Sequence, residues 1–320
     1  MYDLLIIGAG PAGLSCAIEA GKKGLRAVVL DKGSVVNSIQ RFQRDMFFFS
    51  TPELLEIGDI PFVVPTVRPT SLDCVNYYRS VADHYKIDCR FHEHITSLDR
   101  EDGTFILKSA VGNEFISKGV VVATGYYDTP TPLGVPGEDL PHVSHYYRDP
   151  LPYYRRSVVI VGGKNSAVEA ALDLSRHGAS VTVVHRGEDM NPGVKYWIMP
   201  DFKNRVADGS IKVQFGSVVK EIGRTAVKIE SASSGTAEVP ADAVFILIGY
   251  LPDCEFLKSL GIKIDPETLA PVHDASSMET NVPGLYVAGG LVGGKFNNKV
   301  FIENGREHGK LIVAAYLRNA

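Results

Sequence analysis

Two stretches of this 320-residue chain share one pattern, in which a short apolar strand leads through a glycine-rich turn into an alanine-rich helix. The first stretch covers residues 3–24, and the second covers residues 157–178. Each is followed by another short apolar segment, at residues 27–30 and 181–184. Strand, turn, helix and strand in this order form a βαβ unit whose parallel strands are buried on both faces. The repeat therefore predicts an α/β chain with two Rossmann-like dinucleotide-binding domains of similar build.

The rest of the chain continues the alternation of short apolar segments. Residues 129–152 contain six prolines, which disfavour a helix and indicate a connector. A final amphipathic helix is expected from about residue 301. Further strands are expected at residues 105–107, 120–123, 211–213, 226–229, 244–248 and 284–289.

Charge and cysteine content exclude several classes of function. The formal net charge is -4 and no basic block occurs, which argues against nucleic acid or a membrane surface as a partner. No run approaches the roughly 20 apolar residues that span a bilayer, and the first residues lack the basic region of a signal peptide. A cytoplasmic enzyme is therefore expected. None of the cysteines forms a Cys-x-x-Cys pair, so neither a metal site nor a local dithiol is expected from Cys16, Cys74, Cys89 and Cys254.

The first glycine-rich turn has the spacing Gly8-x-Gly10-x-x-Gly13 between a strand and a helix. In the dinucleotide fingerprint, the first glycine permits the tight turn and the second lets the backbone approach the pyrophosphate. The third allows close packing of helix on strand. The pyrophosphate binds at the helix N-terminus, where N–H groups and the helix dipole favour negative charge. Asp31, 23 residues after Gly8, ends the second strand and is expected to bind ribose hydroxyls.

The second glycine-rich turn departs from this fingerprint at its middle position. Residues 162–167 read Gly-Gly-Lys-Asn-Ser-Ala, so Lys164 replaces the middle glycine and either offers charge to phosphates or is a surface residue. After the next strand, the position that would hold an acid in an NAD site holds His185, followed by Arg186. A carboxylate there would repel a 2′-phosphate, whereas histidine and arginine would bind one. The pair therefore favours NADPH over NADH. The alternative is that Arg186 points to solvent at the end of the strand and binds no phosphate.

Two further motifs resemble those of two-dinucleotide flavoproteins. Residues 122–125, Val-Ala-Thr-Gly, resemble their ATG motif, and residues 280–289 resemble their C-terminal flavin motif. This resemblance implies that the first domain binds FAD. Gly290 stands where that family has an aspartate that bonds the flavin ribityl chain. A different group, or water, is then expected to satisfy that hydroxyl.

In this order, the motifs resemble low-molecular-weight thioredoxin reductase-like flavoproteins, whose NADPH domain interrupts the FAD domain. The resemblance implies an FAD domain at residues 1–126 and 251–320, an NADPH domain at 127–250, and a homodimer. FAD would be held by Gly8, Gly10, Pro11, Ala12, Gly13, Asp31, Lys32, Ser38, Thr124, Gly125, Gly289, Gly290 and Glu303. NADPH would be held by Gly162, Gly163, Lys164, Asn165, Ser166, Ala167, His185, Arg186 and Gly249, and no metal is implied.

True thioredoxin reductases have a Cys-x-x-Cys pair shortly before the second glycine motif, and residues 142–147 contain no cysteine. A closer resemblance is to YpdA-type bacillithiol disulfide reductases, which lack that pair. In that family a cysteine within the first glycine motif acts on the disulfide, and that position is Ala12 here. Cys16, one helical turn further on, is either redox-active or a small buried helix residue. The matching segments are residues 47–51, 123–127, 162–167, 195–200 and 301–305.

The resemblance implies hydride transfer from NADPH to FAD and then to an acceptor. A small-molecule disulfide or a small redox protein is the first interpretation of that acceptor, and Ala12 leaves it open. One alternative is a ferredoxin- or flavodoxin-NADP reductase. A flavin monooxygenase is less favoured, because its F-x-G-x-x-x-H signature is not met around residues 140–145. The least favoured alternative is a non-catalytic, dinucleotide-binding redox sensor.

Overall fold

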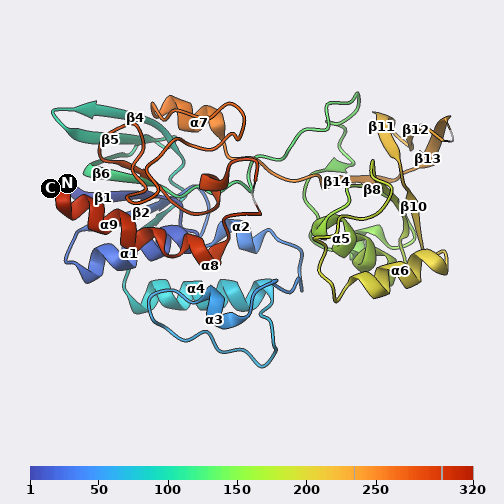
Figure 1. The fold of residues 1–320 in the computed structure, drawn as a ribbon, viewed down its shortest axis with the longest axis horizontal. Helices are drawn as coiled ribbons and strands as arrows, with labels where there is room; N and C mark the ends of the chain where they lie inside the picture. The colour runs from blue at the N-terminus through green and yellow to red at the C-terminus, as the bar shows by residue number, and fades with distance from the viewer. Residues whose placement is uncertain (234, 297, 320) are drawn as a thin grey trace. The chain divides into compact units, whose positions relative to one another are not determined.

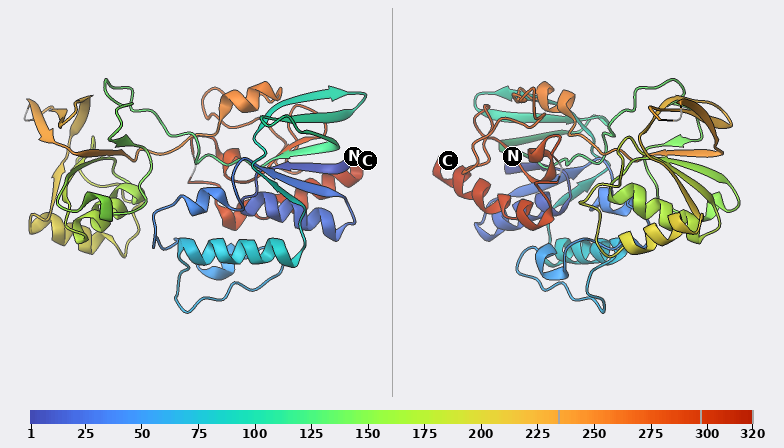
Figure 2. Two further views of the ribbon diagram at one scale, coloured as in Figure 1. Left: turned by 180° about the vertical axis from the view of Figure 1, so that it is seen from behind. Right: turned by 45° about the vertical axis from the view of Figure 1, so that its right-hand side comes forward.

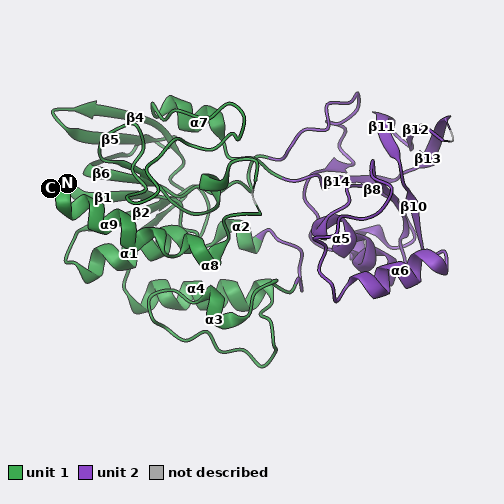
Figure 3. Cartoon of the chain, viewed as in Figure 1, with its two compact units in different colours: residues 1–40, 47–129, 250–320 green, residues 41–46, 130–249 purple. Residues whose placement is uncertain are grey.

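The chain divides into two compact units in the computed structural model, which describes residues 1–233, 235–296 and 298–319 (Figure 3). Unit 1 is built from residues 1–40, 47–129 and 250–320, and unit 2 from residues 41–46 and 130–249. The expected divisions after residues 126 and 250 differ slightly from these. The assignment of residues 41–46 to unit 2 was not expected from the sequence.

Unit 1 contains a seven-stranded sheet with a parallel half and an antiparallel half (Figure 1). In the parallel half, Leu5 pairs with Val28 on one side and with Val120 on the other. All three side chains are fully buried, as expected for a parallel sheet covered on both faces. The parallel strands are β1 (Tyr2–Ile7), β2 (Ala27–Asp31), β3 (Cys89–Phe91), β6 (Glu114–Val122) and β15 (Leu285–Val287). The strands β4 (Ile95–Glu101) and β5 (Thr104–Ser109) extend β6 in antiparallel pairing.

Helices cover both faces of this sheet. On one face, α1 (Pro11–Lys22) and α9 (His308–Asn319) lie side by side (Figures 1 and 2). Their approach requires glycine at 309, because a Cβ there would stand 2.9 Å from the backbone of Cys16. On the other face, α7 (Cys254–Ser259) places Leu257 in one buried cluster with side chains of β5 and β6, and Leu260 just past its end joins the same cluster. The other elements of the unit are α2 (Asn37–Gln40), α3 (Pro52–Leu55), α4 (Ser71–His84), α8 (Ile302–Gly305) and the 3-10 helix η2 (Gly289–Gly293).

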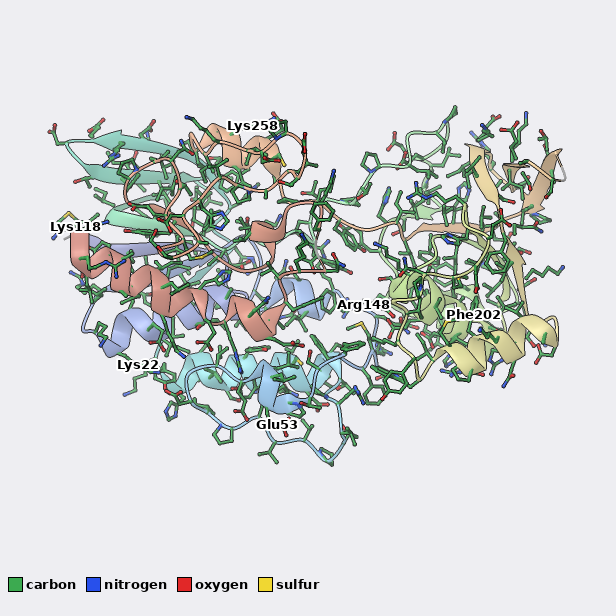
Figure 4. The ribbon with its side chains drawn as sticks, viewed as in Figure 1. Lys22, Glu53, Lys118, Arg148, Phe202 and Lys258 are labelled. Atoms are coloured by element: carbon green, nitrogen blue, oxygen red, sulfur yellow. The ribbon has the colours of Figure 1, made fainter. Side chains whose placement is uncertain are left out.

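Unit 2 has a five-stranded parallel sheet in the order β10-β9-β8-β14-β7. The helices α5 (Asn165–Arg176) and α6 (Met199–Ala207) cover one face, where the buried Phe202 of α6 joins the core (Figure 4). A three-stranded antiparallel sheet packs on the opposite face. The parallel strands are β7 (Val143–Ser144), β8 (Ser157–Val161), β9 (Ser180–Val184), β10 (Ile211–Gln214) and β14 (Ala243–Ile246). The antiparallel strands are β11 (Ser217–Ile222), β12 (Ala226–Ser231) and β13 (Gly235–Pro240).

The predicted α/β class with two dinucleotide-type domains is confirmed, and every expected strand has a counterpart. Several features differ from the expectations. The single C-terminal helix is two helices, α8 and α9, and the expected connector contains β7. The helix α4 was missed, although Thr70 and Asp73 form a capping box at its start. No helix among the described residues is long and apolar enough to cross a bilayer.

Candidate dinucleotide-binding sites

The turn between β1 and α1 is shaped by its three glycines. A Cβ at Gly8, whose φ is +115°, would lie 2.4 Å from the carbonyl oxygen of Ala123, and one at Gly13 would lie 1.9 Å from that of Gly8. These two glycines therefore serve the packing of the protein itself. Gly10 differs, because a Cβ there would meet no atom within 4 Å. Gly10 is the N-cap of α1, and no side chain at this position accepts a hydrogen bond from the first N–H groups of the helix. The open space at Gly10 therefore adjoins the N-terminus of α1.

Asp31 holds this turn from the end of β2. Its carboxylate accepts hydrogen bonds from the N–H of Ala9 at 2.7 Å and from the N–H of Gly33 at 2.8 Å. Val36 in turn donates its N–H to the carbonyl of Ala9 at 2.9 Å. Burial raises the pKa of Asp31, and the two backbone donors oppose that rise. Each carboxylate oxygen keeps a further lone pair, so Asp31 can hold the turn and still accept a ribose hydroxyl.

Residues from two other strands reach the same edge of the unit 1 sheet. The N–H of Ala288 donates to the carbonyl of Val122 at 2.9 Å, which places the end of β15 beside the end of β6. The following turn, Gly289–Gly290, approaches the glycine-rich turn, because a Cβ at Gly289 would lie 2.8 Å from Cβ of Ala12. Parallel strands present their carboxyl ends at this edge, where α/β proteins bind ligands.

Two of the other residues expected to hold FAD, Lys32 and Glu303, have side-chain partners within the protein. Lys32 pairs with Asp128 at 3.0 Å, and Ser38 lies on α2, which begins next to Val36. Glu303 of α8 accepts a hydrogen bond from the hydroxyl of Ser50. Ser50 was not singled out by the sequence analysis, and no motif marks it. Thr124 and Gly125 follow β6 directly, and Gly125 has a left-handed φ of +71°.

His308 is a second residue that the sequence analysis missed. Its Nδ1 accepts a hydrogen bond from the N–H of Gly289 at 3.1 Å, so it holds the Gly289–Gly290 turn only as the neutral ring. Burial, with a smaller contribution from His273, lowers the pKa of His308 to about 4. A lone histidine near the chain end has no sequence pattern that could have indicated this contact.

This pKa predicts a pH dependence of stability. A histidine that is harder to protonate in the folded protein contributes fully above its ordinary pKa of about 6.5, and the contribution is lost as the pH falls towards 4. We expect urea denaturation to show about 2 kcal/mol less stability at the acid end of this range, after discounting for partial exposure. His308→Asn keeps an acceptor without titrating, and should lose this part of the pH dependence. An unchanged pH profile in that variant would contradict the assignment.

In unit 2, Gly163 of the β8–α5 turn and Gly187 after β9 enclose the ring of His185. A Cβ at Gly162 would lie 2.5 Å from the carbonyl oxygen of Leu247, which makes this glycine the counterpart of Gly8. A Cβ at Gly163 would lie 2.2 Å from the ring of His185, and one at Gly187 would lie 2.7 Å from it. Burial, aided by the charge of Arg186, lowers the pKa of His185. The ring is therefore neutral at pH 7 and packs against the turn.

Lys164 and Arg186 provide the positive charge of this turn. Lys164 is the N-cap of α5, and both side chains are exposed. Ala167 is fully buried beneath the turn, while Ser166 is exposed in the first turn of α5. Gly249 lies just past β14 with a φ of +107°, where its carbonyl accepts the N–H of Thr131. His185 and Arg186, which were expected to act as a pair, therefore differ: the ring of His185 packs against the turn, whereas Arg186 is exposed.

A segment after β9 folds back onto the start of α5, and the sequence analysis did not foresee it. The N–H of Asn191 donates to the carbonyl of Gly163 at 3.0 Å, and the N–H of Lys195 donates to Oδ1 of Asn165 at 2.7 Å. Lys195 is buried and pairs with Glu169 of α5 at 2.5 Å. Burial raises the pKa of Glu169, and Lys195 opposes that rise. The ion pair fixes residues 191–195 against the turn.

Cys16 occupies the interior of unit 1. It is fully buried in an apolar cluster, and its backbone touches Gly309 of α9. Burial raises the pKa of its thiol to about 12, and the charge of Glu19 adds to the rise. A thiolate, the reactive form of cysteine, is therefore strongly disfavoured at this position. Within the described part of the chain, no group of three or more His, Cys, Asp or Glu side chains could hold a metal ion.

Comparisons with known proteins agree with this architecture. The model of the pyridine nucleotide-disulphide oxidoreductase family matches residues 5–289. Bacilliredoxin reductase Bdr of Bacillus subtilis is 41% identical over 311 residues, which cover 97% of this chain and 96% of that protein. A structure of bacillithiol disulfide reductase Bdr (YpdA) from Bacillus cereus superposes with a TM-score of 0.95 at 38% identity, covering 100% of this chain and 99% of that one.

A more distant relative is named for a different activity. A ferredoxin–NADP reductase of Ignicoccus hospitalis is 28% identical over 301 residues, covering 91% of this chain and 90% of that protein. The family model and the Bdr relatives confirm the resemblance found in the sequence. The chain belongs to the pyridine nucleotide-disulphide oxidoreductase family.

Proposed function

We propose that the chain is an FAD-containing, NADPH-dependent oxidoreductase that reduces a disulfide on a small redox protein or a small molecule. The single observation that carries this proposal is the full-length identity of 41% to a bacilliredoxin reductase. The family implies both FAD and a nicotinamide dinucleotide. Two glycine-rich turns at helix N-termini, one in each unit, fit two dinucleotides.

The first turn fits the FAD pyrophosphate. Open space at Gly10 adjoins the N-terminus of α1, and a Cβ at that position would occupy the space. Asp31 stands at the end of β2, where it can accept ribose hydroxyls while it holds Ala9. FAD bound here would supply a two-electron carrier between the nicotinamide and the acceptor. The protein contributes binding, orientation and exclusion of water.

The second turn fits NADPH. Lys164 at the start of α5 supplies charge for the pyrophosphate, and Arg186 after β9 supplies charge for a 2′-phosphate. His185 is neutral and packs beneath them, so its role is to shape the turn. The balanced overall reaction is NADPH, one proton and a disulfide giving NADP⁺ and two thiols. We place this chemistry in the cytoplasm and in a homodimer, on the family resemblance.

Stopped-flow spectroscopy of the purified protein tests the proposal. NADPH should bleach the absorbance of the oxidised flavin, and a bacilliredoxin in its disulfide form should restore it faster than dissolved oxygen does. A protein that reconstitutes with no FAD would overturn the proposal. Fast flavin reduction followed by reoxidation with ferredoxin alone would leave the dinucleotide chemistry in place and replace the acceptor.

That second outcome has support of its own. The chain shares 28% identity with a ferredoxin–NADP reductase over nine-tenths of both proteins. Cys16, Cys74, Cys89 and Cys254 are all free, and the thiol pKa of each is raised first by burial. An acceptor that takes electrons from the flavin without a protein thiol suits these surroundings. A ferredoxin-type acceptor is therefore the second candidate.

We infer further that Cys16 packs α1 against α9 and takes no part in electron transfer. Cys16→Ala should reduce and reoxidise its flavin within about twofold of the wild-type rates, because the wild-type thiol stays protonated and buried. The substitution should instead lower the melting temperature, since the shorter side chain loses contacts in the core. Cys254→Ala, at a partly exposed position, is the matched control. Loss of disulfide-driven reoxidation in Cys16→Ala alone would contradict this inference.

A further inference from the structure

Two successive glycines let two side chains contact one turn at the nucleotide edge of unit 1. A Cβ at Gly289 would lie 2.8 Å from Cβ of Ala12, which belongs to the first turn of α1. A Cβ at Gly290 would lie 2.6 Å from Cε1 and 2.8 Å from Cδ1 of Tyr126. The ring of Tyr126 therefore rests on the backbone of Gly290, and a larger residue at 290 would have to displace it.

The position of Tyr126 in the chain fixes where this ring stands. Tyr126 follows the segment that closes β6, and the carbonyl oxygen of Ala123 in that segment lies 2.4 Å from the Cβ position of Gly8. The turn Gly289–Gly290 is held from its other side by His308, through the N–H of Gly289. The ring thus stands at the edge where Gly10 leaves open space beside α1.

The hydroxyl of Tyr126 is a donor with no partner among the residues that the structure describes. The side chain is half-buried, and burial alone raises the pKa of its phenol, so the hydroxyl keeps its proton at neutral pH. A half-buried tyrosine hydroxyl that has no protein partner can donate its hydrogen bond to a bound molecule. Tyr77 and Tyr78 of α4 differ from it, since both are buried and both hydroxyls donate to backbone carbonyls.

We propose that Tyr126 is an FAD-binding residue whose hydroxyl donates a hydrogen bond to the bound dinucleotide and whose ring requires glycine at position 290. This inference rests on the proposed function, because it names a further contact to the cofactor of that same site. In this proposal the contact to FAD comes from Tyr126, whose ring covers Gly290, and not from a side chain at position 290. Positions 126 and 290 should therefore behave as one unit.

Titration of the FAD-free protein with FAD tests the hydroxyl. Tyr126→Phe keeps the ring and should bind FAD about three- to tenfold more weakly, as for the loss of one neutral hydrogen bond. The absorption band of its bound flavin should also shift, which a merely structural role would not cause. Tyr2→Phe removes a hydroxyl from the opposite end of β1 and is the matched control. Wild-type affinity and an unshifted band in Tyr126→Phe would overturn the inference.

A second pair of variants tests the requirement for glycine. Gly290→Ala should weaken FAD binding in the wild-type background, because its methyl group displaces the ring, and should have little further effect in a Tyr126→Ala background. Equal losses in both backgrounds would overturn the link between the two positions. A wild-type protein that binds no FAD would instead overturn the proposed function, so the two failures are distinguishable.

Discussion

Gly10→Ala is expected to yield a stable, folded protein that loses its flavin. The backbone of Gly10 has φ −77° and ψ 174°, which alanine adopts without strain, and its added Cβ would touch no protein atom within 4 Å. The methyl group would stand in the open space at the N-terminus of α1. It should hold the pyrophosphate away from the helix N–H groups, weakening FAD binding on the order of a hundredfold. The flavin content of the purified variant, and FAD titration of its FAD-free form, measure this effect.

Substitutions at two other glycines of the same helix distinguish an effect on FAD binding from an effect on folding. Gly21→Ala places a methyl group in open space at the exposed end of α1, so it should keep both flavin and stability. Gly13→Ala would place its Cβ 1.9 Å from the carbonyl oxygen of Gly8, so it should lower the melting temperature even without FAD. If Gly10→Ala retained its flavin, or melted like Gly13→Ala, the open space at Gly10 would not be the pyrophosphate site.

These contrasts show what local sequence can predict. The spacing of Gly8, Gly10 and Gly13 is a local constraint, since one strand and one helix must meet at a fixed angle. The same holds for the turn at residues 162–163. The parallel strands were found because burial on both faces produces continuous apolar runs, such as those of β1, β8 and β9. The fold class follows from these features alone.

Other features depend on contacts between residues far apart in the chain. The sequence indicates Gly163 as part of a phosphate-binding turn, but its nearest contact is the ring of His185. Likewise, the departure at Gly290 looked like a missing side chain until the ring of Tyr126 was seen to cover it. Neither pair has a spacing that a motif could record. In the antiparallel half of the unit 1 sheet, β5 was expected but β4 was missed for another reason, because β4 is mostly exposed and lacks an apolar run.

Arg186→Gln is expected to lower kcat/KM for NADPH by about ten- to a hundredfold, through KM, and to leave kcat/KM for NADH unchanged. A charged hydrogen bond to phosphate contributes roughly 1.5–3 kcal/mol, and only NADPH has the 2′-phosphate. Lys164→Met should weaken both nucleotides alike, because the pyrophosphate at the start of α5 is common to them. Initial rates of flavin reduction over a range of each nucleotide give these values.

The control for Arg186 is a second arginine of unit 2. Arg176 ends α5 and pairs with Asp201 at 2.5 Å, at the far end of the helix from the glycine-rich turn. Arg176→Gln should therefore change neither nucleotide's KM. Because His185 is neutral and packed against Gly163, the preference for NADPH should persist above pH 7, where an ionisable histidine would have lost its charge. Two results would contradict this prediction: a preference of the wild-type protein for NADH, or equal losses for both nucleotides in Arg186→Gln. Either would show that Arg186 does not bind the 2′-phosphate and only faces the solvent.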